Sequence, residues 1–217
     1  MSGDSVTIQA AGTTTIGAAV SSDNGALQLT NTVSTVTINA DVTSSNGALT
    51  VTFNGGNLTL GDNVDISSTG GALGFVSSGS YTIAASSGGT IISTDNNVSI
   101  PKALAVSRKA AGTASTYHVK AGALLTVSGA LSLTGNDDPR SDGTTLLKIE
   151  AGTIDVTATI AADHATDEVQ IGPTCQATGS GGETCKVLLG ATTSTTVFSL
   201  KEDLRTRNCP TSWMVLT

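Results

Sequence analysis

The sequence contains few aromatic and few charged residues, and both shortages limit the folds it can adopt. Aromatic residues make up 3% of the 217 positions, so a wide core built around large rings is excluded and a narrow aliphatic core is expected. Charged residues make up 12%, whereas amphipathic helices carry many of them on the wet face. Before Pro101 the only charged side chains are Asp4, Asp23, Asp41, Asp62, Asp65 and Asp95. Strands and turns are therefore favoured over helices.

Long apolar runs and basic clusters are also missing. No run of about 18 apolar residues occurs, so no membrane-spanning helix is expected. The net charge is −7, and no basic cluster could neutralise a phosphate backbone, so nucleic acid is not an expected partner. The first residues, MSGDSVTIQ, lack the basic and apolar regions of a secretory signal. We expect that a signal has been removed or that the chain is a segment of a longer protein.

What the sequence does contain is a repeat. The string Gly-Ala-Leu begins at Gly25, Gly47 and Gly71, at a nearly constant spacing, and it returns at Gly122 and Gly129. Two aliphatic series keep a similar spacing. They are Ile16, Ile38, Leu60 and Ile83, and Val20, Val42 and Val64. Repetition at a fixed interval is the signature of a solenoid, so we expect each series to form one internal column.

Each repeat holds three short segments in which apolar and small polar residues alternate, as in Leu49–Phe53. This alternation is typical of strands with one buried face, and Asn and Gly at the intervening positions allow sharp turns. The predicted fold is all-β: a right-handed parallel β-helix (β-solenoid) with about 22 residues and three short strands per coil. An antiparallel sandwich would also have short alternating strands, but it would not repeat one string at a fixed interval.

The last part of the chain differs in composition. It contains three cysteines, Trp213 and the charged run 201–205. The open end of a solenoid exposes strand edges and core, which aggregate unless they are covered. We therefore expect a parallel β-helix over residues 1–173 and a C-terminal cap or docking segment over residues 174–217.

Strings of the type Asn-Gly-Ala-Leu-x-Val, joined by short Thr- and Gly-rich strands, resemble the repeats of filamentous haemagglutinins and related large adhesins. The similarity covers roughly Val6 to Ile100 and again Ala121 to Ile160. In that family the fold is a right-handed β-helix that holds an adhesin out from a bacterial surface. The resemblance implies an adhesin-like rod at the cell surface.

A search for chemistry finds few candidates. Cys175 and Cys185 flank a nine-residue flexible segment, which favours a disulfide in an oxidising location, and Cys209 is left over for an intermolecular bond. Three reduced thiols in a cytosolic protein are the alternative. No cysteine or histidine spacing fits zinc, and His118 and His164 are isolated in sequence.

An enzyme of the polysaccharide-degrading type would need carboxylates at a fixed separation. The one dense group, Asp137, Asp138, Arg140 and Asp142, lies in a Pro-containing stretch that we interpret as a solvated loop, with weak Ca²⁺ binding as the alternative. We therefore expect no catalytic, cofactor-binding or metal site.

Three functions remain at this point. The leading one is a non-catalytic extracellular structural or adhesive rod, which self-associates head to tail or binds a host-surface or glycan ligand. The second is an ice-binding solenoid, because Thr13, Thr14 and Thr15, together with Thr35 and Thr37, indicate a Thr-bearing face, although no strict Thr-x-Thr motif recurs on every coil. The third is a polysaccharide-binding or polysaccharide-degrading, tailspike-like β-helix.

Overall fold

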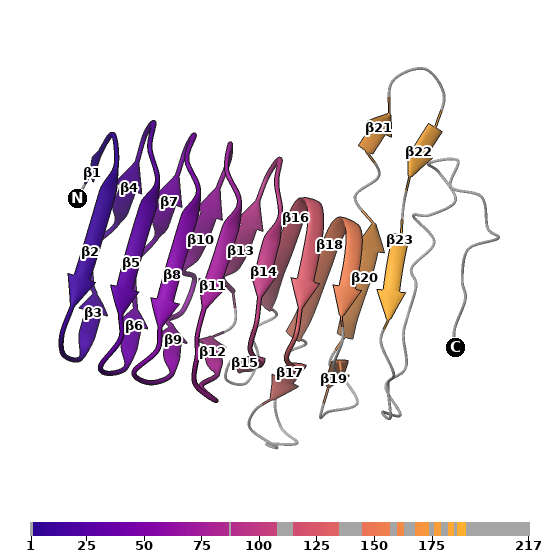
Figure 1. The fold of residues 1–217 in the computed structure, drawn as a ribbon. Helices are drawn as coiled ribbons and strands as arrows, with labels where there is room; N and C mark the ends of the chain where they lie inside the picture. The colour runs from indigo at the N-terminus through magenta and orange to yellow at the C-terminus, as the bar shows by residue number, and fades with distance from the viewer. Residues whose placement is uncertain are drawn as a thin grey trace.

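The computed structural model of the chain is built from stacked β-strands (Figure 1). It describes the backbone of residues 2–86, 88–107, 115–134, 145–156, 160–162, 168–173, 176–178, 182–184 and 186–189, and the side chains of residues 3–86, 88–107, 115–133 and 146–155. Within this part of the chain there is no helix, so none that could cross a membrane. Parallel strands lie about 24 residues apart, so the fold is a β-solenoid, as predicted.

Three stacks of parallel strands form three faces of the coils. Face 1 contains β2 (Val6–Ala10), β5 (Leu27–Asn31), β8 (Leu49–Phe53), β11 (Leu73–Val76) and β14 (Val98–Ile100). Face 2 is a sheet of β3 (Thr14–Ile16), β6 (Val36–Ile38), β9 (Leu58–Leu60), β12 (Ile83–Ser86), β15 (Leu104–Ser107), β17 (Leu131–Thr134) and β19 (Ile160–Ala162). Face 3 contains β1 (Ser2–Gly3), β4 (Val20–Ser22), β7 (Val42–Ser44), β10 (Asp65–Ser68) and β13 (Thr90–Ser93).

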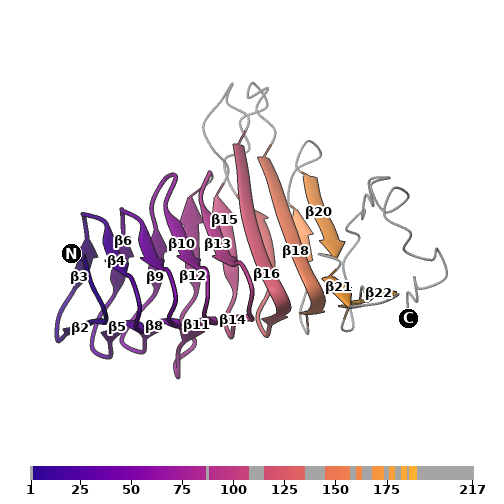
Figure 2. The ribbon, with the colours of Figure 1, turned by 90° about the horizontal axis from the view of Figure 1, so that it is seen from above.

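Two long strands join faces 1 and 3, and they stand out in the view from above (Figure 2). The first parts of β16 (Ser115–Val127) and β18 (Thr145–Val156) extend face 3, and their last residues extend face 1. Beyond them, β20 (Glu168–Pro173) and β23 (Lys186–Leu189) pair in parallel with the two parts of β18. Between these, β21 (Gln176–Thr178) and β22 (Gly182–Thr184) form an antiparallel pair.

The predicted cap boundary falls between β20 and β21. Parallel pairing with the solenoid resumes after that boundary, at β23, while residues 190–217 lie outside the described part of the chain. The division of the chain at residue 173 therefore stays a prediction.

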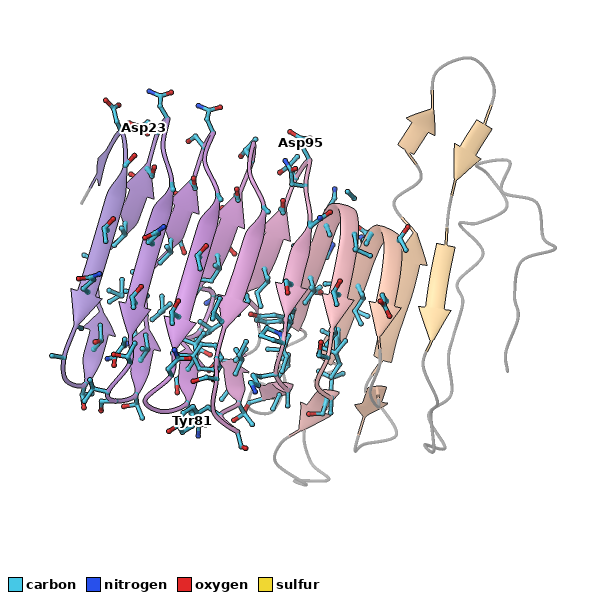
Figure 3. All side chains as sticks on the ribbon, viewed as in Figure 1. Asp23, Tyr81 and Asp95 are labelled. Carbon is cyan, nitrogen blue, oxygen red and sulfur yellow. The ribbon has the colours of Figure 1, made fainter. Side chains whose placement is uncertain are left out.

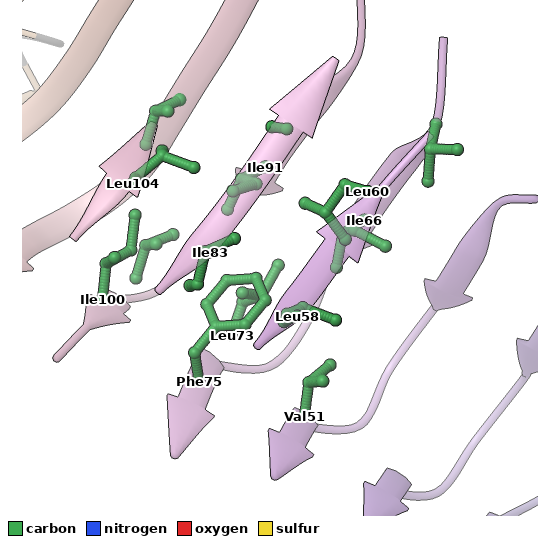
Figure 4. Packing of buried hydrophobic residues seen from close by; sticks show 14 of the residues in the cluster. Val51, Leu58, Leu60, Ile66, Leu73, Phe75, Ile83, Ile91, Ile100 and Leu104 are labelled. Atoms are coloured by element: carbon green, nitrogen blue, oxygen red, sulfur yellow. The ribbon is translucent and has the colours of Figure 1, made fainter. Parts of the chain in front are cut away.

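The core consists of side chains that repeat from coil to coil. Leu27, Leu49 and Leu73 stack in register, as predicted, and each is at most 1% exposed. The close-up shows how aliphatic side chains from all three faces fill the interior, with Phe75 among them (Figure 4). Each side chain is buried by the coils above and below as well as by its own, which is why a narrow core suffices.

One predicted aliphatic column is partly wrong. Ile16, Ile38 and Leu60 do stack, but Ala85 follows Leu60. Ile83 instead stacks on Leu58 of the preceding coil. The stretch between β11 and β12 is longer than its counterparts in the earlier coils, so counting on at a constant interval selects the wrong residue of the strand.

The valine column is also corrected. Val20 and Val42 stack, but the next residue in the column is Ile66 and not Val64. The turn between β9 and β10 is longer than the one between β6 and β7, and Asn63 takes a positive φ of 54° in it. Val64 is 2% exposed, so it fills the inside of this wider corner.

The predicted period holds only for the first coils. On face 1 the steps from Val6 to Leu27 and from Leu27 to Leu49 are nearly equal and match it closely. The later steps of this column, from Val98 to Leu125 and from Leu125 to Ile154, are longer because the later coils contain more residues.

The later Gly-Ala-Leu strings accordingly lose their equivalence to the first three. Leu125, not Leu124, stacks on Val98, so the string at Gly122 is out of step with the column by one position. The string at Gly129 belongs to another face, since its Leu131 joins face 2 opposite Leu104.

The corner between faces 3 and 1 explains the Gly-Ala-Leu motif. A Cβ added at Gly47 would lie 2.1 Å from the carbonyl oxygen of Gly25 in the coil before, so successive corners stack too closely for a side chain at this position. The neighbouring aspartates Asp23 and Asp95 lie along this edge of the solenoid (Figure 3). Glycine is therefore required here for close approach of two backbones.

A buried serine closes each of these corners. Ser22, Ser44, Ser68 and Ser93 stack in register, and each is at most 2% exposed. The Ser68 hydroxyl lies 3.0 Å from the carbonyl oxygen of Gly47 and 2.7 Å from that of Gly71, and it accepts from the Gly71 N–H at 3.2 Å. The hydroxyl thus satisfies turn groups that the strand ladder leaves unpaired.

Candidate functional surface

Face 2 presents a column of threonine side chains to solvent. Thr15, Thr37 and Thr59 are paired in register across three strands. Each lies between two buried side chains of its own strand, so the alternation of the strand turns all three hydroxyls outward. Successive hydroxyls in such a column recur at the strand spacing of about 4.8 Å.

A second polar column runs just before the same strands. The exposed Thr13 and Thr35 occupy it in the first two coils, and the Thr13 hydroxyl lies 3.1 Å from that of Ser34. Asn57 and Thr82 continue it, and the backbone N–H of Thr82 donates to Asn57 Oδ1 at 2.9 Å. The early half of face 2 therefore carries two parallel rows of hydroxyl and amide groups.

The remaining property of face 2 is a lack of charge. None of its seven strands contains Asp, Glu, Lys, Arg or His. In the later coils the Thr37 column continues with Ala84, Ala105 and Ser132, which are smaller, and the two alanines carry no hydroxyl. The strands of this face thus form an uncharged sheet with more hydroxyl groups in its early coils than in its later ones.

Face 3 is charged: its aspartates lie in the earlier coils, and its basic groups lie in the later coils together with Glu150. Asp41 and Asp65 lie in the earlier coils, where Asp41 Oδ1 accepts from the backbone N–H of Asp65 at 3.0 Å. The Thr90 hydroxyl donates to Asp65 Oδ1 at 2.8 Å. Basic groups follow in β16 and β18, starting with His118, which lies next to Thr90 in the sheet. The charge of this face therefore changes sign along the solenoid.

His118, Lys148 and Glu150 form a partly buried ion cluster on face 3. His118 Nε2 lies 3.0 Å from Glu150 Oε2, and Lys148 Nζ lies 2.6 Å from Glu150 Oε1. Burial lowers the pKa of His118, and the charges of Lys148 and Lys120 add to this against the opposing effect of Glu150. Burial alone would raise the pKa of Glu150, but the bonds and charges of Lys148 and His118 outweigh it and hold this pKa below its ordinary value. At neutral pH the ion pair is therefore chiefly that of Lys148 with Glu150.

Tyr117 is a buried polar group with a different role. It is fully buried, and its hydroxyl has no hydrogen-bond partner among the described residues. Burial, with a contribution from the charge of Asp65, raises the pKa of its phenol. The group stays protonated, so it serves as core packing and not as an acid or base.

The predicted site residues fall mostly outside the described part of the chain. This holds for Cys175, Cys185 and Cys209, for His164, and for Asp137, Asp138, Arg140 and Asp142. Gln176 and Thr184, which adjoin Cys175 and Cys185 in the sequence, are paired with each other in the antiparallel sheet. The disulfide and the intermolecular thiol therefore stay predictions. Within the described residues no group of three or more His, Cys, Asp or Glu could hold a metal ion.

Sequence reasoning missed the neighbours of His118. The histidine is isolated along the chain because Glu150 is 32 residues away, whereas the strand pairing of β16 with β18 brings the two together. Extending the repeat at the longer interval of the later coils would have aligned His118 with Thr90 and Lys148.

A small hollow lies among the side chains of the first two coils. Only apolar side chains line it, namely Ile8, Ile16, Val20, Leu27, Leu29 and Val42. The hollow has no polar group that could fix the orientation of a small ligand.

Comparison with known proteins gives no match: no family model, no curated protein and no solved structure is similar to this chain. The resemblance to filamentous haemagglutinins therefore stays a prediction.

Proposed function

We propose that this chain is a non-catalytic structural and adhesive rod that binds an extended, regular surface through face 2. The observation that supports this most is the uncharged seven-stranded sheet with threonines in register. Burying such a face against a ligand requires no charged group to lose its water, and loss of hydration is the largest cost of burying polar surfaces.

The kind of ligand follows from the repetition. Each threonine hydroxyl both donates and accepts, as do the hydroxyls of a polysaccharide. Groups that recur at about 4.8 Å suit a ligand that also repeats, because many weak contacts then act together. A glycan surface is therefore the proposed ligand, and an extracellular or cell-surface location follows from it.

The test is a charge placed in the middle of the face. Thr37→Lys adds a cation to face 2, while Thr50→Lys adds the same cation to face 1 at a matched site, since both threonines are partly exposed and lie between two buried aliphatic residues. Binding to a panel of insoluble polysaccharides, such as cellulose and chitin, is measured by co-sedimentation. We expect retention of the original chain and of Thr50→Lys, and loss for Thr37→Lys. Equal binding by both variants would remove face 2 from the proposal.

Ice binding is a second candidate, favoured by the threonines in register in the first coils. Flat rows of hydroxyl and methyl groups can order water at regular spacing. We expect thermal hysteresis that Thr37→Lys abolishes and Thr50→Lys preserves. Absence of hysteresis in the unmodified chain would reject this candidate and leave the glycan proposal standing.

A further inference from the structure

We propose that face 3 is a self-association surface, on which a second copy of the chain packs in the antiparallel orientation around a two-fold axis at the coil of Thr90 and Ile92. The proposal is independent of the function assigned to face 2. It depends on the order in which charged and uncharged residues follow one another along face 3.

Two outward columns carry this order. The first passes from Asp65 to Thr90, His118 and Lys148, with Asp41 before Asp65. The second consists of Thr43, Ser67, Ile92, Lys120 and Glu150. In the first column two acidic residues precede Thr90, and two basic or protonatable residues follow it.

This order is self-complementary. A two-fold axis that is parallel to the strands and passes through Thr90 reverses the coil order in the second copy. It places Asp65 opposite His118 of the second copy, and Asp41 opposite Lys148. Isologous contacts of this kind use one patch twice, so each pairing occurs twice in the dimer.

The second column supports the same axis. Ile92 is an aliphatic residue that points outward between the polar Ser67 and Lys120 of the adjacent coils. On the proposed axis it meets Ile92 of the second copy, which puts the apolar contact at the centre and the charges around it, as in protein interfaces generally. Lys120 then lies diagonally across from Asp65.

Charge also selects the orientation. If the two copies instead lay with their coils in the same direction, around an axis along the first column, Asp41 and Asp65 would face their own counterparts, and like charges in contact are unfavourable. Glu150 does not reverse the sign of the basic half, because its carboxylate is already bound to Lys148 at 2.6 Å. The antiparallel arrangement therefore has a lower electrostatic energy than this parallel one.

The size of the patch determines the expected affinity. Five coils span about 19 Å, and a strand of three or four residues spans about 10–13 Å. The patch of roughly 250 Å² per copy is well below the about 800 Å² per partner of stable complexes. The dimer should thus form at high protein concentration and dissociate in high salt, since exposed ion pairs are screened.

The test is sedimentation velocity of the full chain, with its cysteines reduced, from about 10 μM to about 1 mM in low and in high salt. We expect a dimer in low salt at the upper concentrations and a monomer in high salt. The double variant Asp41→Lys with Asp65→Lys should remain monomeric, and so should Lys120→Asp with Lys148→Asp. A mixture of the two should regain the dimer, because each presents the charge that the other requires.

The control is Asp23→Lys with Asp95→Lys, which makes the same change of net charge at the exposed corner between faces 3 and 1, outside the two columns. It should dimerise like the original chain. A monomer at every concentration in low salt would overturn the proposal. A dimer that survives in either face 3 variant, or the lack of any dimer in their mixture, would overturn it as well.

Discussion

The early and late coils of this solenoid turn the same corner in different ways. In the early coils the residue that joins the leucine column of face 1 comes five positions after the buried serine, as Leu49 does after Ser44. In β16 and β18 the strand continues through the corner, and this distance along the chain is shorter. It is four positions in β16, from Ala121 to Leu125, and three in β18, from Ala151 to Ile154. Alanine takes the place of serine in the same buried column.

The difference shows what the serine is for. A wide turn leaves backbone carbonyl and N–H groups inside the corner, and these groups need a partner because burial without one is costly. In the shortened corner the chain stays in strand pairing almost throughout, so a buried hydroxyl would have no group to bind. The geometry of the turn, and not the repeat alone, thus determines whether serine or alanine occupies this buried column.

The largest loss of stability is expected from substitutions in the core that the early and late coils share. Leu49→Ala and Leu125→Ala each remove a fully buried side chain of the same column, so each should lower the free energy of unfolding by about 2–5 kcal/mol. Urea denaturation measures both. A loss below about 1 kcal/mol for Leu125→Ala alone would mean that the late coils do not share the core of the early ones.

Exchanging the two corner residues should have the next largest effect. Ser68→Ala leaves the carbonyl oxygens of Gly47 and Gly71 without their hydroxyl partner, and Ala121→Ser buries a hydroxyl where no turn needs one. Each should cost about 1–3 kcal/mol in urea denaturation. If either exchange is neutral, the assignment of the serine to the wide turn is incorrect.

Acid should act on the late coils through the cluster of His118 and Glu150. Because the pKa of His118 is lowered on folding, the unfolded chain binds its proton first, and stability should fall as pH drops below about 6.5. The lowered pKa of Glu150 adds stability that is fully present above about pH 4.5 and is lost as the pH falls further. Melting temperatures across this range measure both stages. His118→Gln should reduce the first stage and weaken the second only in part, since Lys148 still holds the pKa of Glu150 down. An unchanged first stage would contradict the assignment.

The smallest effect is expected at the exposed edge of the early corners. Asn46 Nδ2 donates to the carbonyl oxygen of Asp23 at 2.7 Å and lies 3.3 Å from Asn24 Oδ1. These groups are exposed to water, so Asn46→Ala should cost no more than about 0.5 kcal/mol. A cost above about 1 kcal/mol in urea denaturation would show that the exposed amides stabilise the corner as much as the buried serine does.

How much the sequence can predict depends on the regularity of the coil. The stacking of Leu27, Leu49 and Leu73 is predictable because the turns between them differ little in length. A constant interval puts Ile83 in the wrong column because the turns before it lengthen, and composition does not show how many residues a turn absorbs. The contact of His118 with Glu150 lies beyond the range in which a constant interval holds.

The central claim is that successive coils lie directly on one another although they grow longer. Thr7, Ser99, Thr126 and Asp155 belong to one outward column of face 1, and the last three lie four, five and six coils from Thr7. With the native cysteines replaced by serine, spin labels at Thr7 and at each of the other three positions in turn should give distances by pulsed electron paramagnetic resonance of about 19, 24 and 29 Å. Equal increments of about 4.8 Å are the predicted result. Distances that grow with the number of residues in each coil, or that do not increase in order, would contradict it.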